Sequence, residues 1–72
     1  MNQPSILSPT ARLIIQTVRI AGVPLSIDMI AAETGTPAST VLNVTQELVR
    51  AGHLTRTKIR RYSFFTVPVV PQ

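Results

Sequence analysis

Residues 27–54, IDMIAAETGTPASTVLNVTQELVRAGHL, form the stretch that decides the fold. Two short helical patterns lie on either side of a TGTP break in it. Gly35 takes a positive φ without steric cost, so the first helix can end there and the chain can turn. Thr36 followed by Pro37 predicts the start of the second helix, with the Thr36 oxygen as the helix cap and Pro37 at the first helical position. The stretch therefore predicts two helices joined by a tight turn, the second over residues 37–51.

The second helix has two distinct faces. Its apolar stripe follows the i, i+3, i+4, i+7, i+8 spacing of a helix packed on a core and comprises Val41, Val44, Thr45, Leu48 and Val49. The opposite face is polar and comprises Ser39, Thr40, Asn43, Gln46, Glu47 and Arg50. Short hydroxyl and amide side chains can approach base edges in a major groove, while the N-terminal N–H groups meet phosphate. A face that is simply solvated would also be polar.

Positive charge is concentrated near the C-terminal end. Of the seven Lys and Arg residues, four lie within six positions, and no acid follows Glu47; the four are Arg56, Lys58, Arg60 and Arg61. Such a cluster favours a polyanionic partner, most often nucleic acid, although a solubilising loop is the alternative. The surrounding run, LTRTKIRRYSFFTV, is rich in β-forming residues.

This run predicts a β-hairpin. We expect strands over 54–57 and 61–67, with Lys58, Ile59 and Arg60 at the tip. No Asn-Gly or Asp-Gly pair marks the turn, so the register stays open. Alternation along the second strand puts Tyr62, Phe64 and Thr66 on one face and Ser63, Phe65 and Val67 on the other.

The segments IAAETGTPASTV (30–41) and LVRAGHL (48–54) resemble the winged helix-turn-helix of small regulators in the MarR, ArsR and IclR groups. The resemblance spans roughly residues 10–67. It implies a mainly α fold with a small β-hairpin (α+β), a three-helix winged helix-turn-helix. It also implies that recognition helix 37–51 lies in the major groove and that a basic wing, 55–62, contacts the minor groove or backbone.

The candidate DNA-contacting residues come from that helix, its preceding turn and the wing. They are Thr36, Ala38, Ser39, Thr40, Leu42, Asn43, Gln46, Arg50, Arg56, Lys58, Arg60 and Arg61. Leu42 departs from the pattern, because these families often place a polar residue there. An apolar side chain at this position either touches a thymine methyl or docks on protein.

The flanking sequence completes one domain, predicted over 8–67, with an N-terminal arm over 1–7 and a C-terminal tail over 68–72. Ser8-Pro9 predicts the start of a helix running to about Ala21, with a core stripe of Ala11, Ile14, Ile15, Val18 and Ala21. Leu13 and Ile20 widen its apolar surface, either as a homodimer contact or as part of a three-helix core. The resemblance to winged-helix domains implies that residues 23–25 form a small strand pairing with the hairpin, and Pro24 makes that strand minimal and an edge strand. Ser26 is a candidate cap for the helix that follows.

The chain has few residues of the types that catalyse reactions or bind metal ions. The chain has no cysteine, one histidine (His53) and three acids without a paired motif, so we expect neither an enzyme, nor a metal site, nor a cofactor. Residues 1–7 do not form a signal peptide, and no apolar run reaches the length of a membrane span, so we expect a cytoplasmic, nucleoid-associated protein.

Two functions remain open. The first is a sequence-specific double-stranded DNA-binding protein, a repressor-like transcriptional regulator acting as a homodimer. The second is a protein-interaction module on a winged-helix scaffold, such as a small phage-type or accessory factor. The basic wing favours the first, whereas Leu42, Glu47 and the modest net charge of +4 favour the second.

Overall fold

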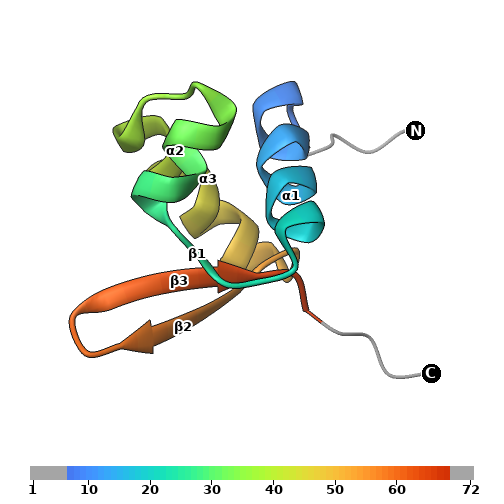
Figure 1. Cartoon of the computed structure of the whole chain (residues 1–72). Helices are drawn as coiled ribbons and strands as arrows, with labels where there is room; N and C mark the ends of the chain where they lie inside the picture. Colours follow the sequence, from blue (N-terminus) through green and yellow to red (C-terminus); the bar gives the residue numbers. More distant parts are fainter. Residues whose placement is uncertain (1–6, 69–72) are drawn as a thin grey trace.

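The computed structural model describes residues 7–68. Three helices, α1 (Pro9–Ala21), α2 (Ile27–Thr34) and α3 (Ala38–Ala51), lie on one side of a small sheet (Figure 1). The sheet has the order β1-β3-β2, with β1 (Leu25–Ser26), β2 (Thr55–Ile59) and β3 (Tyr62–Thr66) all antiparallel. This confirms the predicted winged helix-turn-helix fold, mainly α with a small β-hairpin.

The core lies where the three helices meet the sheet. Each helix contributes the apolar positions that its periodicity predicts, and the sheet adds one aromatic ring; the buried hydrophobic residues are Ala11, Ile14, Ile15, Val18, Leu25, Ile30, Val41, Leu48, Leu54 and Phe65. Thr45 is the one buried polar side chain among residues 7–68, and its hydroxyl donates to the Leu42 carbonyl at 3.0 Å. Ala21, predicted in the core stripe of α1, is instead exposed, because it lies in the last turn, beyond the part of α1 that the core covers.

The turn between α2 and α3 is set by Gly35, which has φ +68° and ends α2 in the left-handed conformation. Its N–H donates to the Ala31 carbonyl at 2.9 Å, and the Thr36 N–H donates to the same carbonyl at 3.3 Å, so this carbonyl at the helix end is satisfied. A Cβ added to Gly35 would meet no atom within 4 Å, so the backbone angle, and not a lack of space, favours glycine here.

The prediction for the start of α3 was wrong. Pro37, not Thr36, is the N-cap residue, and no side chain accepts a hydrogen bond from the first turn of the helix. The two other caps are as predicted, since Ser8 accepts from the Ala11 N–H and Ser26 from the Met29 N–H, both at 3.2 Å.

The turn of the hairpin lies elsewhere than predicted, and the structure gives the register that the sequence left open. The strands pair from Thr55 opposite Thr66 to Ile59 opposite Tyr62, so the turn holds two residues, Arg60 and Arg61. Lys58 and Ile59, predicted at the tip, belong to β2. The predicted pairing of the 23–25 segment with the hairpin is confirmed, because β1 is hydrogen-bonded to β3. The strand ends one residue later than predicted, at Ser26.

Most of the predicted arm (1–7) and tail (68–72) falls outside the described residues. Within residues 7–68, no helix is both long and apolar enough to cross a lipid bilayer.

Candidate nucleic-acid interface

The exposed face of α3 carries a row of polar side chains. The helical period places Ser39, Asn43, Gln46 and Arg50 opposite the buried Val41, Thr45 and Leu48. All four are exposed, and the row runs for roughly 16 Å at 1.5 Å per residue. Arg50 at the end of the row is its one charged member, so most of the row presents hydroxyl and amide groups.

Two further exposed residues flank this row. Leu42 lies on one edge with 45% of its side chain exposed, and Glu47 lies on the other. The Leu42 side chain offers an apolar contact next to Asn43. Glu47 is the acid on this face of α3, and its carboxylate would repel phosphate at that edge.

The strand register decides which side of the sheet each wing cation occupies. Arg56 is paired with Phe65 and Lys58 with Ser63, and directly paired residues of antiparallel strands share a face. Phe65 is buried in the core under the helices. Arg56 and Lys58 therefore extend from the helix-bearing side of the sheet, where α3 also lies.

The turn adds two more positive charges. Arg60 and Arg61 occupy the end of the hairpin, which extends beyond the helices (Figure 1). Both are exposed, and no acid lies between Leu48 and Pro68. In the same view α3 runs from its N-terminal end, the end farther from the sheet, to its C-terminal end beside the sheet.

Of the candidate residues, Thr36 is half-buried in the turn and the other eleven are exposed: Ala38, Ser39, Thr40, Leu42, Asn43, Gln46, Arg50, Arg56, Lys58, Arg60 and Arg61. Thr36 loses the role of helix cap, as described above, and contributes its backbone N–H to the Ala31 carbonyl. Ile59 and Tyr62 were not among the candidates, although both are exposed beside the turn. Ile59 was predicted in the turn, and only the register places it in β2 opposite Tyr62.

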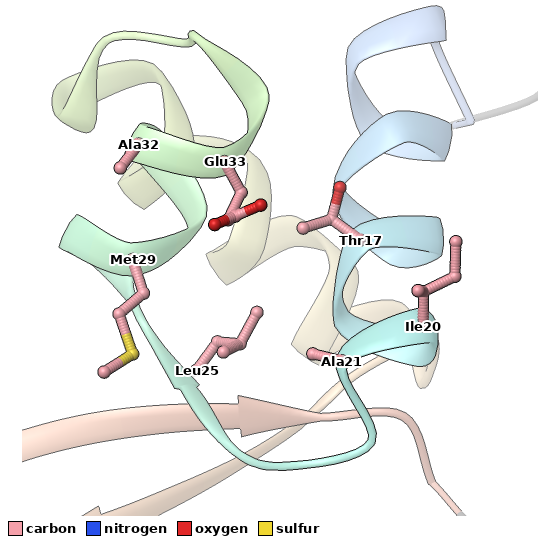
Figure 2. Close-up of a pocket in the computed structure, with 7 residues that line it drawn as sticks. All are labelled: Thr17, Ile20, Ala21, Leu25, Met29, Ala32 and Glu33. Atoms are coloured by element: carbon pink, nitrogen blue, oxygen red, sulfur yellow. The ribbon is translucent and has the colours of Figure 1, made fainter.

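A groove lies elsewhere on the domain. It measures about 640 Å³ and is lined by Thr17, Ile20, Ala21, Leu25, Met29, Ala32 and Glu33 from α1, β1 and α2. Figure 2 shows these side chains in front of α1 and α2, with α3 behind the two helices. The groove is mainly apolar, and Glu33 is its one ionisable group.

Residues 7–68 hold no group of three or more His, Cys, Asp or Glu side chains able to bind a metal ion. His53 is half-buried after α3, where its backbone N–H donates to the Leu48 carbonyl at 2.8 Å.

Comparison with known proteins identifies the domain. The family model described as the IclR helix-turn-helix domain matches residues 13–58, more than half of the chain. A solved structure, described as the protein structure of type III plasmid segregation TubR, superposes with a TM-score of 0.68 at 14% sequence identity, over 94% of this chain and 78% of that one. At that identity the likeness shows the fold alone. A comparison with curated protein sequences gave no match. The chain thus belongs to the IclR helix-turn-helix domain family and is a winged helix-turn-helix DNA-binding domain.

Proposed function

We propose that this protein is a sequence-specific regulator of transcription that binds double-stranded DNA. The N-terminal half of α3 enters the major groove, and the wing contacts the neighbouring minor groove and backbone. The observation that carries the proposal is the placement of Arg56 and Lys58 on the helix-bearing side of the sheet, as the Phe65 pairing requires. Cations on the opposite side would face away from a duplex bound to α3.

The roles divide by chemistry. Asn43 and Gln46 carry amides that can form paired hydrogen bonds with adenine, while Ser39 and Thr40 offer single hydroxyl contacts. The wing cations contact phosphate or the minor groove and supply affinity without reading sequence. The first turn of α3 has no side-chain cap and no acid, so its N–H groups suit a phosphate oxygen.

The proposed output is repression, because a protein seated across both grooves prevents other proteins from reaching the same base pairs. Such a protein acts where the DNA is, in the cytoplasm of a bacterial or archaeal cell at the nucleoid. A module that binds another protein through Leu42 is the competing function, since 45% of that apolar side chain is exposed at the edge of the same surface.

Salt dependence tests the proposal against this competitor. Duplex affinity is measured by fluorescence anisotropy from about 50 to 200 mM salt, where a protein making several phosphate contacts loses affinity steeply. In the variant with both Arg60→Ala and Arg61→Ala, affinity for every duplex should fall and the slope of log K against log salt should decrease by about 2.

The matched control removes the same charge from the opposite end of the domain, by Arg12→Ala with Arg19→Ala on exposed positions of α1. That variant should keep the wild-type slope. Equal losses in the two variants would mean that only net charge matters, and weak binding without salt dependence in the wild-type protein would favour the protein-interaction module.

A homodimer forms the second part of the proposal. Leu13 and Ile20 are seven residues apart on one face of α1, and 75% of the Ile20 side chain is exposed. Together with the exposed Met29 in the groove of Figure 2, they give an apolar surface that monomers seldom leave in water. Because α3 lies behind α1 and α2, a second copy on this surface leaves both recognition helices accessible.

Sedimentation equilibrium checks the dimer. Ile20→Lys should convert a dimer into a monomer at micromolar concentration, because it buries a charge in an apolar contact. Ala51→Lys adds the same charge at an exposed position on α3 and should leave the mass unchanged. A monomeric wild-type protein would refute this part of the proposal without affecting the DNA-binding part.

A further inference from the structure

The wing has a strand edge to which no other strand is paired. In the sheet order β1-β3-β2 the middle strand is β3, so β2 borders one strand only among residues 7–68. All five residues of β2 are exposed, so neither a helix nor a loop of this part of the chain covers the strand. The backbone groups on its outer edge are therefore accessible to a further extended segment.

The two-residue turn decides which backbone groups point to that edge. Ile59 and Tyr62, on either side of the turn, must exchange both of their hydrogen bonds, because the alternative pattern would require bonds between the two adjacent turn residues. Hydrogen-bonded and non-hydrogen-bonded pairs alternate along an antiparallel ladder, so Thr57 is bonded to β3 as well. Arg56 and Lys58 therefore direct their N–H and C=O groups to the outer edge of β2.

The side chains of the same two residues carry positive charge. Arg56 and Lys58 extend from the helix-bearing side of the sheet, as their pairing with Phe65 and Ser63 requires. Thr57 between them extends from the opposite side, which carries no charge along β2. A strand added to this edge would place alternate residues opposite Arg56 and Lys58, on the same side of the sheet. Acids at alternate positions, with an uncharged residue between them, complement this edge.

A second copy of this chain does not fit the edge. Its own β2 would place Arg56 and Lys58 against the same two cations, and like charges directly opposite each other in a sheet are destabilising. The acids of the chain are Asp28, Glu33 and Glu47; all three lie in helices, and no two of them are at alternate positions. The complementary acids must therefore come from another protein.

We propose that an acidic, extended segment of a partner protein adds to the edge of β2 as the fourth strand of the sheet, with acids at alternate positions opposite Arg56 and Lys58. In this mode of binding the main-chain hydrogen bonds give affinity and the alternate side chains give specificity. The added segment covers two cations that the proposed function assigns to DNA, so the protein binds either the partner or the duplex. This regulatory consequence rests on the proposed function, whereas the strand addition does not.

Hydrogen exchange of single amides, measured by nuclear magnetic resonance on the whole chain without DNA, tests the added strand. In the free protein the N–H groups of Arg56 and Lys58 should exchange faster than that of Thr57, which is bonded to β3. The probe is a capped peptide of about nine residues in which glutamate and threonine alternate. At a concentration ten times its Kd it should slow exchange at Arg56 and Lys58 about tenfold and leave Thr57 unchanged.

A peptide of the same composition with its glutamates in consecutive positions is the matched probe. Only part of its acids can lie on the helix-bearing side, so it should bind several-fold more weakly. Charge reversal by Arg56→Glu with Lys58→Glu should weaken binding of the alternating peptide about tenfold and favour a peptide with lysine in place of glutamate. Arg12→Glu with Arg19→Glu changes the net charge equally on α1 and should alter the affinity by less than about twofold.

Four outcomes decide the inference. Failure of the probe to protect Arg56 and Lys58, or equal affinity for the two peptides, overturns the added strand. Protection of these amides that rises with protein concentration alone would assign the edge to a second copy and overturn it too. A peptide that protects the edge without displacing duplex DNA in an anisotropy assay overturns the regulatory step. A chain that binds the peptide but no duplex would refute the proposed function and support the added strand.

Discussion

The side-chain oxygen of Ser26 accepts a hydrogen bond from the backbone N–H of Met29 at 3.2 Å. Ser26 is also the last residue of β1, where it pairs with Phe64 of the wing. A single residue thus ends the edge strand and caps the first helix of the helix-turn-helix. Because of this, the position of α2 depends on the strand that holds the wing.

Removing this cap should destabilise the domain measurably. Ser26→Ala should lower the free energy of unfolding by about 1 kcal/mol, the usual cost of losing an N-cap oxygen. Thr36→Ala is the matched control, since no side chain caps α3. Urea denaturation followed by circular dichroism compares the two variants. Equal destabilisation would show that Thr36 supports α3 in a way that the hydrogen bonds do not indicate.

The turn of the wing allows stability and binding to be separated. Arg60 has φ +58°, a left-handed conformation that is unfavourable for a residue with a side chain, whereas Arg61 next to it does not have a positive φ. Arg60→Gly should therefore raise the free energy of unfolding by up to about 1 kcal/mol, while Arg61→Gly should lower it by about 0.5–1 kcal/mol.

Both variants lose one positive charge, so their affinities for duplex DNA should fall by similar factors. Thermal unfolding gives the stability and anisotropy gives the affinity. A less stable Arg60→Gly protein would contradict the strained turn. A large difference in affinity would instead assign the two arginines different contacts.

Recognition of a particular DNA sequence should depend on Asn43. Its amide lies at the centre of the exposed row on α3, so Asn43→Ala should cost about 1–3 kcal/mol on the preferred duplex and little on a random one. Selection of bound fragments from a random library identifies the preferred duplex, and competition assays on both duplexes give the difference. An equal loss on preferred and random DNA would place Asn43 outside the base contacts.

Leu42→Ala tests whether the exposed apolar side chain on the same face of α3 contacts DNA or a protein. If Leu42 packs on a thymine methyl, the variant should lose its preference for thymine at one position and keep its affinity elsewhere. The selected sequences of wild type and variant show this directly. Unchanged DNA preference combined with loss of a protein complex would support the protein-interaction module instead.

Local signals determined much of the fold. The three helices end at glycines in the left-handed conformation, and two of them begin at a serine that accepts a backbone hydrogen bond, because these features depend on a few neighbouring residues. The α3 start was the exception, since Thr36-Pro37 is compatible with two cap positions one residue apart. Residue spacing also predicted which face of α3 is exposed, since helical periodicity is independent of what the helix packs against.

The arrangement of the wing was decided by tertiary structure. Without an Asn-Gly or Asp-Gly pair, the register of the hairpin was undetermined, and a shift of one residue moves every side chain to the other face. Packing of Phe65 under the helices and pairing of β1 with β3 select one register. That selection puts Arg56 and Lys58 on the side of α3 and leaves Ile59 and Tyr62 exposed on the other. The sequence specified which residues the wing contains, and long-range burial of one aromatic ring decided the direction in which each of them points.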